Sequence, residues 1–134
     1  MKLTRASSYA IHAVLYMAQQ DEDGGPVASH HIAKAQEIPE RFLLKVLKPL
    51  VSAGLLLSLR GPNGGYRLAR PAGKISLLEV LEAVEGPMRG TVTLTPGKGQ
   101  SPLDKRLEHL CDEVADMAKK RLARVSLAEL AKKS

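Results

Sequence analysis

The chain contains few cysteine and aromatic residues. Among its 134 residues are one cysteine, Cys111, one phenylalanine and no tryptophan. A single cysteine excludes an internal disulfide framework and any metal site built from four cysteines of one chain, and it is compatible with a reducing cytosol. With so few aromatic rings, leucine, valine and alanine must form the core, which favours helices.

Long apolar runs are also missing. No stretch approaches the roughly 20 apolar residues that a transmembrane helix needs. The N-terminal stretch carries Tyr9, His12 and Tyr16 and no clean small-residue cleavage site, which argues against a signal peptide. We therefore expect a cytoplasmic protein.

Motifs typical of enzymes are absent as well. The sequence shows no paired carboxylates, no nucleophile–base motif and no metal constellation, so we expect no enzymatic activity.

Positive charge is concentrated in the N-terminal half. The net charge is +6, and residues 1–75 contribute +5 of it, with 10 Lys or Arg against 5 Asp or Glu. Residues 76–134 hold 10 against 9 and contribute only +1. Such an imbalance indicates a polyanionic partner for the N-terminal half.

A predicted β-hairpin lies within this basic half. The apolar runs Leu55–Leu59 and Tyr66–Ala69 flank the turn Pro-Asn-Gly-Gly. Arg60, Arg67 and Arg70 cluster on and just past the hairpin. A glycine tip lets backbone approach a narrow surface, and neighbouring guanidinium groups suit phosphates or an A·T-rich minor groove. The order helix, helix, hairpin is that of a winged helix, and it indicates binding to duplex DNA.

Helical periodicity and capping residues predict the remaining elements. Thr4 caps a first helix ending at Gln19, a short helix begins at Ala28 or Ser29, and a third helix has Pro39 as its first residue and ends before Gly54. The third helix should bend at Pro49. Its predicted apolar stripe is Phe42, Leu43, Val46, Leu47 and Leu50, opposite Arg41, Lys45 and Lys48.

The C-terminal half contains two capping boxes and one long helix. The motif Ser76-Leu-Leu-Glu79 opens a helix that ends at Glu85, and Ser126-Leu-Ala-Glu129 opens a terminal helical turn. Residues 86–100, between these two motifs, are predicted to form a flexible loop. Within it, polar and apolar residues alternate over 91–95, as they would in a short strand. A helix from Ser101 to about Val125 carries apolar residues at coiled-coil spacing, and a partner subunit would cover that seam more simply than its own domain would.

Several segments together resemble the bacterial Rrf-two family of winged-helix transcription factors. They are Met1-Lys-Leu-Thr4, Tyr9-Ala10, the turn and helix 38–54, Arg60-Gly-Pro-Asn-Gly-Gly-Tyr66, Ile75–Val84 and Ser126-Leu-Ala-Glu-Leu130. The resemblance implies a mainly α fold with a small hairpin wing. It also implies a homodimer in which two helix-turn-helix units bind a pseudo-palindromic operator. We expect residues 1–85 to bind DNA, 86–100 to occupy the sensor-loop position and 101–134 to dimerise.

The resemblance implies which residues form the site, because their positions match those of the family's motifs. The recognition helix maps to Pro39 through about Leu50, and the family's minor-groove arginine maps to Arg60. The predicted DNA-binding residues are Lys2, Arg5, Glu40, Arg41, Leu44, Lys45, Lys48, Arg60, Asn63, Gly64, Tyr66 and Arg67. The predicted dimerisation residues are Leu103, Leu107, Leu110, Val114, Met117 and Leu122. Family members with better-known operators often carry Ser near Arg41 and Glu near Leu44. This chain differs at both positions, so its operator sequence cannot be inferred from theirs.

The chain departs from the family in the sensor loop. Many members hold an iron–sulfur cluster there with three cysteines, whereas residues 86–100 contain none and Cys111 lies within the long helix. We therefore expect a regulator that acts as a repressor and has neither that cluster nor another cofactor. Two alternatives stay open: a metal or redox sensor using His12 and Cys111 across a dimer, and a winged-helix module that binds another protein. An unknown small-molecule or protein effector would be expected to bind beside the loop 86–100.

Overall fold

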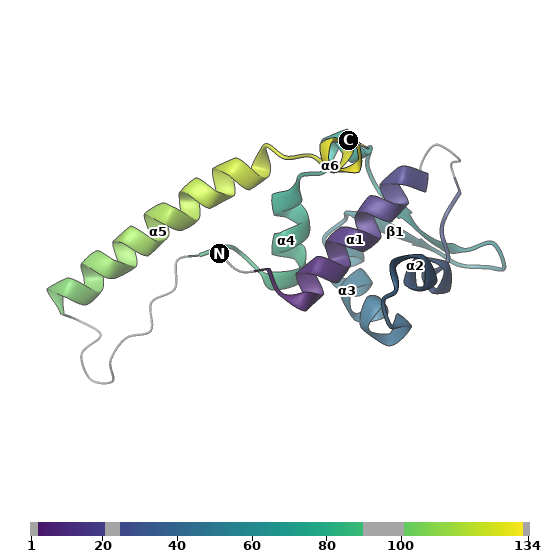
Figure 1. Ribbon diagram of the computed structural model, residues 1–134, viewed down its shortest axis with the longest axis horizontal. Helices are drawn as coiled ribbons and strands as arrows, with labels where there is room; N and C mark the ends of the chain where they lie inside the picture. The colour runs from purple at the N-terminus through teal and green to yellow at the C-terminus, as the bar shows by residue number, and fades with distance from the viewer. Residues whose placement is uncertain (1–2, 21–24, 90–100, 133–134) are drawn as a thin grey trace.

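The computed structural model describes residues 3–20, 25–89 and 101–132. These residues form a mainly helical fold with one two-stranded antiparallel sheet (Figure 1), which confirms the expected fold class. The order of elements is α1 (Arg5–Gln20), α2 (Ser29–Gln36), α3 (Glu40–Ser52), β1 (Leu56–Leu59), β2 (Gly65–Leu68), the 3₁₀ turn η2 (Ala72–Lys74), α4 (Leu77–Glu85), α5 (Pro102–Ala123) and α6 (Leu127–Ala131).

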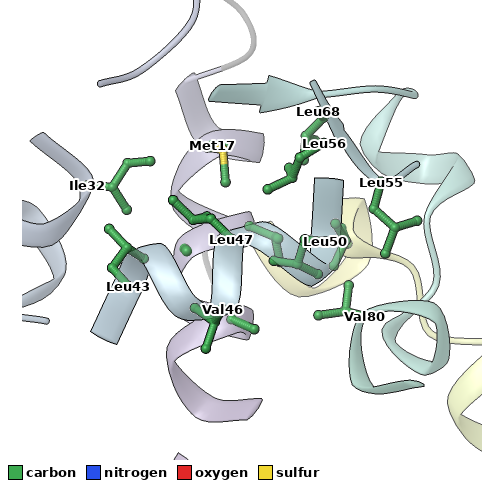
Figure 2. Close-up of a cluster of buried hydrophobic side chains, with 14 of the residues drawn as sticks. Met17, Ile32, Leu43, Val46, Leu47, Leu50, Leu55, Leu56, Leu68 and Val80 are labelled. Atoms are coloured by element: carbon green, nitrogen blue, oxygen red, sulfur yellow. The ribbon is translucent and has the colours of Figure 1, made fainter. Parts of the chain in front are cut away.

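The core lies where α1, α3, α4 and the start of the hairpin meet (Figure 2). Leu43, Leu47 and Leu50 of α3 have no exposed surface, and each contributes about 1.5–3 kcal/mol by its burial. On α1, Ala10 and Ala13 are also fully buried, and their small side chains let neighbouring helices approach closely. This packing determines which face of α3 is turned outward.

Most helix ends follow the expected local chemistry. The Thr4 hydroxyl accepts from the Ser7 amide at 3.1 Å, and Ser76 and Glu79 form a complete capping box. At the end of α3, Gly54 has φ +77°, with Gly54 N–H donating to Val51 and Leu55 N–H to Leu50. The start of α3 differs from the expectation: Pro39 is the N-cap of the helix rather than its first helical residue, and the helix continues through Pro49 to Ser52.

The segment around Val27, which precedes α2, holds the hairpin against the body. Leu57 pairs with Arg67 and Ser58 with Tyr66, while Tyr66 also exchanges two backbone hydrogen bonds of 2.8 Å with Val27. A Cβ on Gly65 would lie 2.4 Å from the Val27 carbonyl oxygen, and one on Gly64 would lie 2.2 Å from the Leu59 oxygen. A side chain at either position would therefore clash with the chain's own backbone. From the sequence, the glycines are explained only by close approach of the tip to a partner surface.

The long helix α5 projects from one end of the body, and the hairpin extends toward the other (Figure 1). Ser101 caps α5 by accepting from the Asp104 amide. The helix ends at Ala123, slightly before the expected Val125, and has no fully buried side chain. After it, α6 returns to the body: Leu127 is fully buried, Leu77 N–H donates to Val125 at 2.8 Å, and Leu127 N–H donates to Ile75 at 2.9 Å.

Some expectations fall on residues that the structure does not describe. Lys2 and the predicted strand at 91–95 lie outside the described ranges, as does most of the expected loop 86–100. At the start of that loop, the Met88 amide donates to the Glu82 carboxylate at 2.8 Å. Within the described helices, none is both long and apolar enough to cross a bilayer.

Candidate nucleic-acid interface

The outward face of α3 is the first part of the candidate site. Leu43, Val46, Leu47 and Leu50 occupy the buried side of the helix, so helical geometry turns the intervening side chains outward. All five predicted DNA-binding residues on this helix are exposed: Glu40, Arg41, Leu44, Lys45 and Lys48. The resulting surface is mainly cationic.

Phe42 departs from the prediction that it belongs to the buried stripe. It is 37% exposed, because the core is already filled by the leucines on the adjacent face of α3. The Arg41 guanidinium carbon lies 4.7 Å from the centroid of its ring, and the Lys45 ammonium nitrogen lies 5.7 Å away. Exposed cation–π contacts contribute about 0.5–1 kcal/mol each, so Phe42 helps to orient both cations.

Glu40 is the one carboxylate of α3, and it already has a partner. The Ser29 hydroxyl donates to Glu40 Oε1 at 3.0 Å, which joins the first residue of α2 to the first residue of α3. A negative charge at a helix N-terminus is favourable in itself. Glu40 therefore has a structural role in addition to the predicted contact with DNA.

The hairpin supplies the second part of the site. Arg60 and Asn63 at its tip are exposed, as is Arg67 on β2, while Gly64 and Tyr66 are half-buried. Arg70, which belongs to the same sequence cluster, is engaged elsewhere: its guanidinium donates to the Lys74 carbonyl at 3.0 Å and to Glu79 at 2.5 Å. Arg70 thus attaches the base of the hairpin to the start of α4.

A hollow of about 360 Å³ separates α3 from the hairpin. Leu44, Lys48, Val51 and Ser52 line it from the helix side, and Ser58 and Tyr66 line it from the hairpin side. Leu44, Lys48 and Tyr66 are predicted site residues, whereas Val51, Ser52 and Ser58 are not. Ser52 lies one helical turn after Lys48, which is the only sequence signal that places it on the same face.

The start of α1 brings a further cation to the site. Arg5 and Lys45 line an apolar hollow of about 190 Å³ whose other walls are Ala6, Tyr9, Phe42 and Val46. Nearby, the Thr4 and Ser7 hydroxyls both donate to the Glu85 carboxylate, the latter at 2.9 Å, and so fasten this end of α1 to the end of α4. Arg5 is therefore held beside α3, as the predicted site requires.

One ionisable group near the hairpin base has a perturbed pKa. Burial of Glu79 raises its pKa, but hydrogen bonds from Arg70 and from the Ser76 backbone lower it by more, together with the attraction of the Arg70 charge. The net pKa of Glu79 lies below the ordinary value of 4.5. The carboxylate that completes the capping box is consequently charged at neutral pH.

The chain has one cysteine, and the described residues form no cluster of metal-ligating side chains. In the described parts of the chain, no group of three or more His, Cys, Asp or Glu side chains converges. Cys111 is half-exposed on α5, and His12 is exposed on α1. By sequence, residues 90–100 contain none of these four residue types. The three thiolates that an iron–sulfur cluster of the usual kind requires are therefore not available from one chain.

Known proteins are similar to this chain in sequence. The Rrf2 family, described as "Iron-dependent Transcriptional regulator", matches residues 3–133. A Haemophilus influenzae protein named as an HTH-type transcriptional regulator is 33% identical over 99% of this chain and 88% of its own length. The protein aau3 of Rhizobium meliloti is 37% identical over 77% of this chain, but the match spans only 66% of that longer relative.

A solved structure agrees with the fold. The global cysteine regulator CymR of Bacillus subtilis has a TM-score of 0.79 and 27% identity, with 98% of this chain and 96% of that chain covered. Transcriptional regulators of this kind are a non-enzymatic class, in agreement with the expectation from sequence. The chain belongs to the Rrf2 family of DNA-binding transcriptional regulators.

Proposed function

We propose that the chain is a homodimeric, sequence-specific DNA-binding repressor that acts in the cytoplasm. The observation that carries this proposal is the set of exposed cations on two elements: Arg41, Lys45 and Lys48 on α3, and Arg60 and Arg67 on the hairpin. In this proposal α3 enters the major groove, Arg60 enters the adjacent minor groove, and Arg5 and Lys2 contact phosphates.

The exposed stripe on α5 supports the homodimer. Its five predicted seam residues, from Leu103 to Met117, are 39–70% exposed. An apolar stripe at 3.5-residue spacing is typical of a helix that packs against another helix, and a second copy supplies an equal one. We propose residues 1–85 as the DNA-binding unit, 101–134 as the dimerisation unit, with Leu122 in the seam, and 86–100 as the sensor-loop position.

The proposed regulator has no three-cysteine cluster. Its single cysteine is what supports this part of the proposal. Repression needs only occupancy of a promoter, which a tightly bound dimer provides without any further surface. A small-molecule or protein effector, if one acts, would bind beside the segment 86–100.

Selection of bound duplexes from a random pool tests sequence-specific binding. We expect an enriched pseudo-palindromic motif whose half-sites are centred about one helical turn apart. Affinity for the selected duplex should fall roughly a thousandfold or more between about 50 and 200 mM salt if the dimer neutralises about 6–10 phosphates.

The alternatives predict different results. A protein-binding module would enrich no motif and would bind DNA weakly and without sequence preference. A sensor using His12 and Cys111 would give coloured, iron-containing protein when purified without oxygen, and alanine variants at both positions would lose the colour. Absence of an enriched motif contradicts the proposed function, and bound iron contradicts the part that concerns the cofactor.

A further inference from the structure

An exposed leucine lies in the middle of the cationic face of α3. Leu44 is 42% exposed, and the exposed cations Arg41 and Lys48 stand three residues before it and four after it. This spacing places the three side chains on one helical face. Neighbouring Leu43 and Leu47 fill the core, so Leu44 is not needed there.

The chemistry of α3 limits which base edges it can recognise. In the major groove, adenine is matched by Asn or Gln, cytosine by a carboxylate, guanine by Arg or Lys, and the thymine methyl group by an apolar side chain. Residues 40–52 contain no Asn, Gln or Asp, and their one Glu, Glu40, accepts from the Ser29 hydroxyl. Cations for guanine and Leu44 for thymine remain on the central face. Phe42, the other exposed large apolar side chain of α3, lines the separate hollow beside α1.

Open space lies next to Leu44. It lines the hollow of about 360 Å³ between α3 and the hairpin, opposite Ser58 and Tyr66, so the hairpin does not cover its side chain. Lys48 lines this hollow on the helix side, and Arg41 is exposed on the same face of α3. Both cations are complementary in charge to a phosphate backbone, which makes duplex DNA the occupant that the surface favours over an apolar peptide.

We propose that Leu44 is a specificity-determining residue that recognises thymine through its C5-methyl group in the major groove of each half-site. This inference rests on the proposed function and adds to it the base that one side chain distinguishes. Burial of one methyl group corresponds to about a fourfold change in affinity for each half-site, and about fifteenfold when both half-sites are altered.

Replacement of thymine by deoxyuridine isolates this contact, because it removes the methyl group and leaves base pairing intact. In the selected duplex, each symmetric pair of thymines would be replaced in turn, and binding of the full-length protein measured by fluorescence anisotropy. We expect one pair whose replacement weakens binding by about fifteenfold. If no thymine pair responds, the inference is wrong, although the enriched motif would still support the regulator.

Variants assign the methyl contact to the side chain. Leu44→Ala should bind the thymine and deoxyuridine duplexes equally well, while Leu44→Met should keep most of the discrimination. Leu130→Ala, which alters a leucine of similar exposure, 39%, on α6, should discriminate as the unmodified protein does. Full discrimination by Leu44→Ala would overturn the inference. Since Leu44 is exposed, circular dichroism should show folded protein for every variant.

Discussion

At the scale of single residues, Gly65 is a position that cannot accept a side chain unless the backbone shifts. It has φ +151°, and an added Cβ would lie 2.4 Å from the carbonyl oxygen of Val27, whose backbone pairs with Tyr66. We expect Gly65→Ala to lower the free energy of unfolding by about 1–3 kcal/mol, measured by urea denaturation. Gly25→Ala is the control, since nothing lies within 4 Å of that position. Equal midpoints for both variants would contradict this account.

Arg60 is the residue on which the proposed minor-groove contact depends. It is exposed at the tip of the hairpin, one residue after β1 ends. Arg60→Ala should weaken operator binding by about 1–3 kcal/mol and relax the preference for the adjoining A·T-rich segment, as a repeated selection from random duplexes would detect. Arg106→Ala on α5 removes the same charge at another exposed position. If both variants lose affinity equally, total charge and not a local contact is responsible.

Residue positions also show what the sequence can and cannot predict. The outward cations of α3 follow from helical periodicity, because an amphipathic helix has only one way to bury its leucines. The exposure of Phe42 does not follow, since it depends on how much of the stripe the core can accommodate. Ser58 and the hollow beside it were missed because their place depends on how the hairpin packs against α3. The predicted contacts of these residues with DNA remain predictions.

At the scale of elements, the start of α4 combines a capping box with an ion pair. Ser76 and Glu79 satisfy each other's backbone donors, and Arg70 adds a second partner to the Glu79 carboxylate. Because the folded-state pKa of Glu79 lies below 4.5, its charge stabilises the fold above that pH, and the stabilisation is lost as pH falls through the lower folded pKa. Acid should therefore weaken this helix start.

Glu79→Gln tests this pH dependence while keeping a side chain that a capping box accepts. We expect the variant to unfold more easily than the unmodified protein at neutral pH, by no more than about 1 kcal/mol because the pair is partly exposed. The difference should shrink as pH falls below 4.5. In an Arg70→Gln background the pH-dependent part should decrease. A difference that is constant with pH would exclude the charge as its cause.

Capping motifs were the most predictable elements of the chain. Both Ser-x-x-Glu sequences begin helices, and Thr4 caps α1, because a cap involves only residues within one helical turn. Contacts between distant segments were not predictable in the same way. The pairing of Val27 with Tyr66 and the link from Thr4 and Ser7 to Glu85 join residues that no local pattern relates.

At the scale of the whole molecule, the exposed stripe of α5 should determine the oligomeric state. Leu110→Glu places a charge in the middle of the proposed seam, and we expect it to shift the dimer toward monomer at micromolar concentration in sedimentation equilibrium. Operator affinity should fall by more than about a hundredfold, since the two half-sites would bind independently. Because Leu110 is 55% exposed in the single chain, the variant should stay folded.

A matched variant on the opposite face of α5 controls for this experiment. Asp112 is two residues after Leu110 in the helix and points away from the seam by heptad position. Asp112→Ala should remain dimeric and bind the operator normally. If the unmodified protein is monomeric, or if Leu110→Glu remains dimeric, the apolar stripe of α5 does not form a dimer interface.

The return of α6 to the body has a consequence for how target sites can be arranged. Val125 and Leu127, on either side of Ser126, are hydrogen-bonded to Leu77 and Ile75, and Leu127 is buried beneath them. The end of the protruding helix that joins the body is thus fixed to the unit that carries the hairpin. In a two-fold assembly this stiffness would make the separation and rotational phasing of the paired half-sites as selective as their base composition.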